Sequence, residues 1–142
     1  MAYTRTSSIR ILLVEDFGPH RSLTARILRE NPDLVLISEA EDGLEAVARA
    51  QELKPDVILM DIGLPKVNGL EAARQIRHLV PFSKIIFLTQ ERDAALIREA
   101  FSLGAWGYVL KTQAANDLLP ALVSIEHGKR FVSGELGGNA LH

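Results

Sequence analysis

The sequence has 142 residues, of which 47% are hydrophobic and 24% charged, and its formal net charge is -2. This length indicates one domain with a sizeable core, and the charge gives no sign of a nucleic-acid-binding surface or an anionic-membrane partner. The absence of cysteine excludes disulfides and thiolate metal sites. No apolar run is long enough to cross a bilayer and residues 1–8 lack a signal peptide's apolar centre, so we expect a cytoplasmic location.

Strands and helices are predicted to alternate along the whole chain. The predicted strands are short apolar runs at residues 9–14, 34–37, 57–60, 85–88 and 108–110. Apolar residues at helical spacing follow each of them. The residues expected on inner helix faces are Leu23, Ile27, Leu28, Leu44, Val47, Ala48, Leu70, Ala73, Ile76, Leu96, Ala100, Leu103, Leu118, Leu122, Val123 and Ile125. Five such units with short connections predict a doubly wound α/β fold around a five-stranded parallel sheet.

Local signals locate several helix ends. Asp42 begins the second helix, Asn68 caps the third, the fourth covers residues 92–103, and Gly128 ends the last helix in a left-handed conformation. Residues 9–133 are thus expected to form the domain, with 1–8 as a disordered lead-in and 134–142 as a tail or linker.

Pro120 needs a special position in the last helix. A proline inside a helix costs about 3 kcal/mol. We therefore expect Asp117 to be the cap, which puts Pro120 in the first turn, or else a bend at Pro120.

The most informative stretch is the third strand, residues 57–60. It ends at Asp61, and Gly63 and Pro65 then prevent its continuation. Open α/β sheets place their chemistry at the carboxyl ends of their strands. Asp61 is therefore predicted to be the reactive group.

Polar residues end four of the five predicted strands. They are Glu15 and Asp16, Asp61, Thr89, and Lys111. With the usual strand order 2-1-3-4-5, the ligand crevice lies between strands one and three. We therefore expect the three acids around one crevice, flanked by Thr89 and Lys111.

Such a group of residues suits phosphoryl transfer with a divalent cation. Carboxylates at such short distances repel one another unless a cation lies among them. A site with oxygen ligands only favours Mg²⁺ over metals that prefer nitrogen or sulfur. Asp61 would be the nucleophile, Lys111 would supply a positive charge, and the Thr89 hydroxyl would donate a hydrogen bond. Each residue also has a structural explanation, as a turn former, helix cap or solvated strand end, but the ordered set favours the functional one.

The motifs resemble the response-regulator receiver (CheY-like) domain of two-component signalling, which implies a flavodoxin/CheY-like fold. The resemblance runs from Ile9 to about Gly134 and is carried by residues 12–16, 57–65, 88–89 and 104–111. It implies that Asp61 accepts a phosphoryl group from the phosphohistidine of a sensor histidine kinase. It also implies that Glu15, Asp16, Asp61 and the Gly63 carbonyl hold Mg²⁺.

The resemblance further implies a switch and an output. Thr89 and Tyr108 would be a coupled pair that reshapes the face formed by the fourth helix, fifth strand and fifth helix. Residues 128–133 are similar to the LuxR/FixJ subfamily, which implies transcription regulation through a DNA-binding domain absent from this chain. Relatives often form a homodimer through helices one and five or through the switch face, which leaves the oligomeric state of this chain open. The chain itself would contact no nucleic acid and no membrane, and would catalyse only its own phosphorylation and dephosphorylation, so we do not classify it as an enzyme.

Two positions depart from the family pattern within the domain. Gln90 stands where a small residue is usual, so we expect it to cover part of the phosphoryl pocket and to slow small phosphodonors and attacking water. Thr112 stands where many relatives have a cis-proline, which leaves the Lys111–Thr112 peptide geometry open.

Other functions that this architecture supports fit the sequence less well. A receiver-shaped adaptor that needs no phosphorylation would not require the complete acid, hydroxyl and ammonium set. A flavodoxin-like FMN binder needs a phosphate loop where Glu15 and Asp16 would repel phosphate. A Mg²⁺-dependent phosphohydrolase usually has an acid at the position of Gly63.

Overall fold

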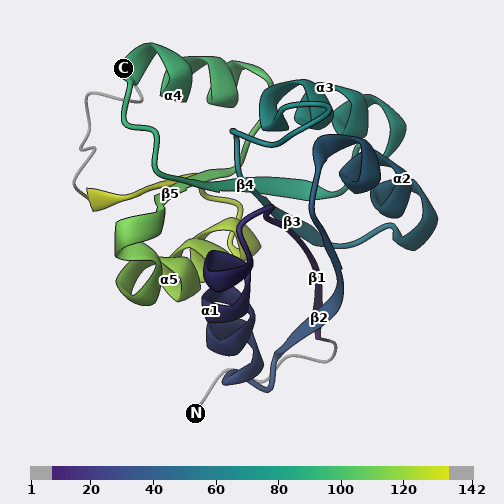
Figure 1. Ribbon diagram of the computed structural model, residues 1–142. Helices are drawn as coiled ribbons and strands as arrows, with labels where there is room; N and C mark the ends of the chain where they lie inside the picture. The colour runs from purple at the N-terminus through teal and green to yellow at the C-terminus, as the bar shows by residue number, and fades with distance from the viewer. Residues whose placement is uncertain (1–7, 135–142) are drawn as a thin grey trace.

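A parallel six-stranded sheet forms the centre of the computed structural model, which describes residues 8–134 (Figure 1). Its order is β2-β1-β3-β4-β5-β6, so the predicted order 2-1-3-4-5 is confirmed. The strands are β1 Ile9–Val14, β2 Leu34–Ala40, β3 Val57–Met60, β4 Lys84–Thr89, β5 Gly107–Leu110 and β6 Phe131–Val132. The predicted lead-in and tail lie almost wholly outside the described residues, and the domain boundaries stay a prediction.

Helices cover both faces of the sheet. They are α1 Gly18–Arg29, α2 Gly43–Leu53, α3 Gly69–Leu79, α4 Ala94–Ser102 and α5 Ala114–Glu126, the last preceded by a 3₁₀ turn at Lys111–Gln113. α1 and α5 lie on one face, and α2, α3 and α4 lie on the other (Figure 1). Among the described residues, no helix combines the length and apolar character that crossing a bilayer requires.

The double covering explains why the strands are continuous apolar runs. In β3, Ile58 and Met60 belong to the core cluster beneath α2, α3 and α4, whereas Val57 and Leu59 belong to the cluster beneath α1 and α5. All four are buried, because successive side chains point to opposite faces and each face meets a helix layer. The strand is therefore packed on both faces up to Met60, the residue that precedes Asp61.

The predicted start of the second helix at Asp42 and the predicted cap of the third helix are confirmed. The side chain of Asp42 accepts a hydrogen bond from the Glu45 amide at 2.7 Å, and that of Asn68 accepts one from the Glu71 amide at 2.9 Å. Gly128 has φ of +77°, as predicted for a left-handed helix end. The fourth helix is shorter than predicted, because the Asp93 side chain caps it and it begins at Ala94.

Some inner-face predictions were wrong. Leu44 and Val123 are 58% and 54% exposed, and Leu23 is exposed as well. Ala48 is also exposed, and the buried face of α2 consists of Gly43, Ala46, Val47 and Ala50. Of the residues predicted for the fourth helix, Ala100 is buried and Leu96 packs half-buried against the core, whereas Leu103 follows α4 and is only half-buried. Each error is a rotation of about one position around a helix whose apolar residues are spread over more than one face.

The prediction that Asp117 caps the last helix was wrong. α5 begins at Ala114, so Pro120 lies inside the helix and not in its first turn. Pro120 is exposed, and its ring faces away from the core. Ala114 and Ala115 are strong helix formers, and they extend the helix toward the N-terminus despite the proline.

A candidate phosphoryl-transfer site at the carboxyl edge of the sheet

The pairing register of the sheet brings the predicted site residues together. Val14, Met60, Phe87 and Tyr108 stand side by side in neighbouring strands. The polar residues follow this row within one to three positions, because each strand ends just beyond it. Glu15 and Asp16 follow β1, Asp61 follows β3, Thr89 ends β4 and Lys111 follows β5.

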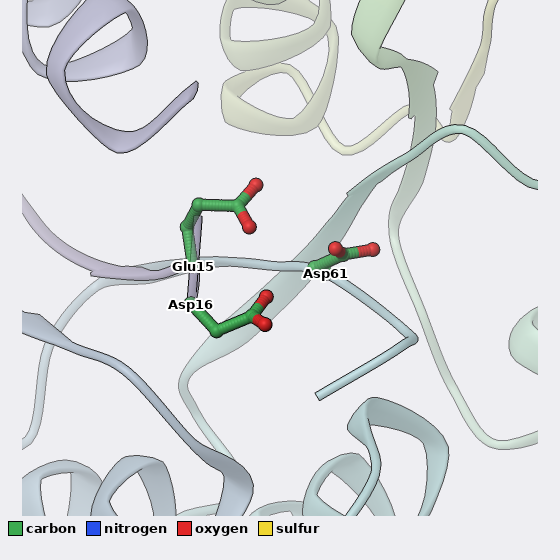
Figure 2. Close-up of side chains that lie close together, drawn as sticks. All are labelled: Glu15, Asp16 and Asp61. Atoms are coloured by element: carbon green, nitrogen blue, oxygen red, sulfur yellow. The ribbon is translucent and has the colours of Figure 1, made fainter. Parts of the chain in front are cut away.

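The three acids converge on one point. Each offers a carboxylate oxygen that lies within 4.8 Å of one on the other two. Figure 2 shows Glu15 and Asp16 projecting from the segment after β1, with both carboxylates on the side that faces Asp61. Glu15 and Asp61 are buried, whereas Asp16 is exposed. The predicted acid cluster is therefore formed, with one member open to solvent.

The Asp61 carboxylate is held by three donors. Its Oδ1 accepts hydrogen bonds from the amides of Ile62 at 2.7 Å and Gly63 at 3.4 Å. Its Oδ2 accepts one from Lys111 Nζ at 2.8 Å. The turn that ends β3 thus fixes one oxygen by backbone amides and presents the other to the ammonium group.

The Lys111 ammonium connects two acids at once. Its Nζ lies 2.8 Å from Asp61 Oδ2 and 2.6 Å from Glu15 Oε1. The other Glu15 oxygen accepts a hydrogen bond from the Phe17 amide at 3.1 Å. Two buried carboxylates therefore share one cation, which offsets their mutual repulsion only in part.

Burial and hydrogen bonding act in opposite directions on Lys111. Burial alone would lower the pKa of its ammonium group, but the hydrogen bonds and charges of Asp61 and Glu15 raise the pKa above 10.5. The group is therefore charged at neutral pH and remains a cation beside Asp61.

The donor set fits a hard divalent cation. Three carboxylates with one ammonium leave an excess of negative charge, and two unit charges 4.8 Å apart repel by about 3.5 kcal/mol at an effective dielectric of 20. Carboxylate oxygens are the ligands that Mg²⁺ prefers, and the exposed Asp16 leaves room for the waters that Mg²⁺ retains. Gly63 lines a cavity beside these acids. That its carbonyl oxygen is a further metal ligand stays a prediction.

The predicted switch residues meet at Glu91. The buried Thr89 hydroxyl accepts a hydrogen bond from the Glu91 amide at 3.3 Å. The Tyr108 hydroxyl donates one to the Glu91 carbonyl oxygen at 2.9 Å. Burial of the Tyr108 ring, together with the nearby charges of Glu91 and Asp61, raises the pKa of its phenol. The two residues predicted to be coupled therefore share one backbone partner, which the sequence did not indicate.

A cavity of about 360 Å³ opens beside the acids. Gln90 and Thr89 line it, together with Phe17 and His20 from the start of α1. The His20 ring packs edge-on against Phe17, with ring centroids 4.8 Å apart. Gln90 thus lies where the sequence predicted, and its effect on rates stays a prediction. The Lys111–Thr112 peptide bond is trans.

The sequence did not indicate the role of Gly69, which packs closely against the backbone of Asp61. Gly69 begins α3 and donates its amide to the Ile62 carbonyl at 2.7 Å. A Cβ at this position would collide with the Asp61 carbonyl oxygen, and one at Gly43 would collide with the Val67 carbonyl. Both glycines directly follow a capping residue, Asp42 or Asn68, and this repeated pair was the available signal.

Comparison with known proteins identifies the family. The family profile described as "Response regulator receiver domain" matches residues 11–123. The transcriptional regulatory protein LnrK of Bacillus subtilis (strain 168) is 36% identical over 94% of this chain and 61% of its own length. LiaR of the same organism is 37% identical over 94% of this chain and 63% of its own length. The chain therefore spans about three fifths of the length of these relatives.

A solved structure agrees with these relatives. A two-component response regulator of the LuxR family from Aurantimonas sp. SI85-9A1 superposes with a TM-score of 0.89 and 32% sequence identity, covering 95% of this chain and 96% of that one. The predicted CheY-like fold and the likeness to the LuxR branch are thus confirmed. On its fold, its family match and its relatives, the chain belongs to the response regulator receiver domains of two-component systems.

Proposed function

We propose that this chain is a cytoplasmic phosphoacceptor, which takes a phosphoryl group from the phosphohistidine of a sensor histidine kinase onto Asp61. The observation that carries the proposal is the position of Lys111 Nζ, 2.8 Å from Asp61 and 2.6 Å from Glu15, beside a third acid. This arrangement combines a carboxylate nucleophile, a fixed cation and a metal-binding acid cluster at one sheet edge.

The chemistry assigns a role to each side chain. An Asp61 carboxylate oxygen forms a bond to phosphorus while the bond from phosphorus to the imidazole nitrogen breaks, and the imidazole leaves with that electron pair. Lys111 remains protonated and stabilises the charge on the phosphoryl oxygens, and the Thr89 hydroxyl donates a hydrogen bond to one of them. Glu15, Asp16, Asp61 and the Gly63 carbonyl would hold Mg²⁺, which supplies further neutralisation of negative charge when bound.

The proposed switch follows from the shared partner of Thr89 and Tyr108. When the Thr89 hydroxyl turns to the phosphoryl group, it leaves the Glu91 amide. The loop at Glu91 then rearranges, and the Tyr108 hydroxyl, which donates to the carbonyl of the same residue, follows it. The face formed by α4, β5 and α5 changes as a result and biases an output. Because relatives include transcriptional regulatory proteins, we propose transcription as that output, exerted through a DNA-binding domain elsewhere.

Intact mass measurement after incubation with Mg²⁺ and acetyl phosphate tests the proposal. Wild type is expected to gain one phosphoryl group, and Asp61→Asn none. Asp56→Asn is a matched control, because Asp56 stands just before the same strand at its opposite end and bonds the Arg10 amide. An adduct on Asp61→Asn, or none on wild type, would contradict the assignment, and the second result would favour a phosphorylation-independent adaptor.

A further inference from the structure

The chain returns to the sheet after α5. We name residues 130–133 the return segment, which contains β6 and lies along the free edge of β5, as the yellow strand of Figure 1 shows. The Phe131 amide donates to the Trp106 carbonyl at 3.0 Å. Phe131 packs against the core cluster of the α1 and α5 side, and Val132 packs against the opposite one. The return segment therefore packs against both core clusters, although it contains only two strand residues.

Its last residue, Ser133, is wholly buried and bonds the strand twice. The Ser133 amide donates to the Tyr108 carbonyl at 3.0 Å. The Ser133 hydroxyl oxygen accepts a hydrogen bond from the Leu110 amide, also at 3.0 Å. The side chain thus replaces the main-chain carbonyl that a longer sixth strand would have offered to Leu110.

Leu110 links Ser133 to the site, because it bonds the Ser133 hydroxyl and directly precedes Lys111. In the sheet it stands beside Thr89, and its amide donates to the hydroxyl of Ser133, which directly follows β6. The next residue is Lys111, whose ammonium group contacts Glu15 and Asp61. The hydroxyl of Ser133 therefore fixes the end of β5 at the point where the lysine leaves the sheet.

We infer that Ser133 is a positioning residue for Lys111, so that docking of the return segment completes the phosphoryl-transfer site. The inference rests on the proposed function. The three acids of the proposed metal site follow β1 and β3, and β4 and β5 separate these strands from β6. Loss of the Ser133 hydroxyl should thus affect the step that needs the lysine and spare the binding of Mg²⁺.

Further contacts hold the start of the return segment and the end of α5 that precedes it. The Arg130 guanidinium lies 4.7 Å from the Trp106 ring centroid, and its Nε donates to the Ala105 carbonyl at 3.2 Å. Lys84 Nζ lies over the same ring at 4.5 Å and donates to the Ile125 carbonyl at the end of α5. The return segment is held at both ends, and only its Ser133 end leads to the site.

The test compares two rates and two affinities. Ser133→Ala is expected to lower the rate constant for phosphorylation by acetyl phosphate at saturating Mg²⁺ about tenfold, because misplacement of a contacting group by a fraction of an ångström is costly. The dissociation constant for Mg²⁺, measured by calorimetry, should not rise. Ser83→Ala is the matched control: its hydroxyl is also buried and bonds a backbone group, the Pro55 carbonyl, at the opposite edge. It should change neither quantity.

Three results would overturn the inference. One is an unchanged rate in Ser133→Ala, and another is an equal loss in Ser83→Ala, which would indicate general loosening. A wild type that forms no adduct would overturn the proposed function as well, whereas an adduct with an unchanged rate in Ser133→Ala would refute only the role of Ser133. If Ser133→Ala does not fold, the isosteric pair Ser133→Thr and Ser133→Val isolates the hydroxyl, and the threonine variant must react faster.

Discussion

A single ammonium group determines the electrostatics of the site at the residue scale. Lys111 pairs with two buried carboxylates, and this pairing outweighs its burial and raises its pKa above 10.5. The stability that this pairing confers is fully present below the unfolded pKa of the lysine. It is lost as the pH rises through the higher folded pKa.

The raised pKa of Tyr108 also makes the folded protein less stable at high pH, and this effect can be measured. Its buried phenol keeps its proton above pH 10.0, where the unfolded chain loses it, so the free energy of unfolding falls as the pH rises beyond that value. We expect Tyr108→Phe to lose less stability than wild type between about pH 9.5 and about pH 11.5. Urea unfolding across this range measures the difference, and equal slopes in the two proteins would contradict the pKa shift.

Gln90 gives a prediction about access to the phosphoryl group. Its side chain lines the cavity beside Asp61, and a methyl group at that position leaves more space for small donors and for water. We expect Gln90→Ala to be phosphorylated faster by acetyl phosphate and to hold the phosphoryl group for a shorter time. Decay of the adduct, followed by intact mass, measures the lifetime. Gln51→Ala on the exposed side of α2 is the control, and equal lifetimes in all three proteins would reject the idea.

At the scale of elements, α5 contains a proline, Pro120, that removes a helix hydrogen bond and can be substituted. Pro120 stands in the seventh position of the helix and cannot donate to the Asn116 carbonyl, and it is exposed, so its removal costs no core contact. Proline costs about 3 kcal/mol relative to alanine in a helix, and its stiffening of the unfolded chain returns up to about 1 kcal/mol.

Pro120→Ala is therefore expected to raise the free energy of unfolding by about 2 kcal/mol. Urea denaturation measures the change. Pro81→Ala, in the loop after α3, should give no such increase. A destabilised Pro120→Ala protein would show that the ring is needed where it stands.

The elements that the sequence failed to predict have identifiable physical reasons. Helix starts follow from competition between neighbouring residues, and the prediction gave Pro120 more weight than Ala114 and Ala115. β6 has two residues, too few for any periodic pattern, and it exists because the edge of β5 needs a partner. By contrast, the helix start at Asp42 and the cap at Asn68 were predicted correctly because such signals depend on local residues alone.

At the scale of the whole molecule, topology made most of the site predictable. A parallel sheet brings every strand's carboxyl end to one edge, so the order of the strands alone places Glu15, Asp16 and Asp61 together. The contacts between side chains of neighbouring strand ends depend on the direction of each side chain and could not be predicted. These include the double pairing of Lys111 and the meeting of the switch pair at Glu91.

The excess negative charge of this edge predicts a response of the whole fold to Mg²⁺. A ligand that binds only the folded state stabilises it by about 2.7 kcal/mol at roughly 100 times its dissociation constant. Asp16→Asn should be more stable than wild type in a chelator and should gain less from Mg²⁺, because one repelling carboxylate is gone. Thermal unfolding with and without Mg²⁺ measures both effects, with Asp33→Asn at the opposite edge as control.

The contacts of the Trp106 ring with Lys84 and Arg130 have a practical consequence. Trp106 is the only tryptophan in the chain, and one of its two cationic neighbours belongs to the return segment. Departure of Arg130 would change the polarity around the indole ring, so the intrinsic fluorescence of the unlabelled protein reports directly on whether the C-terminal edge of the sheet is closed.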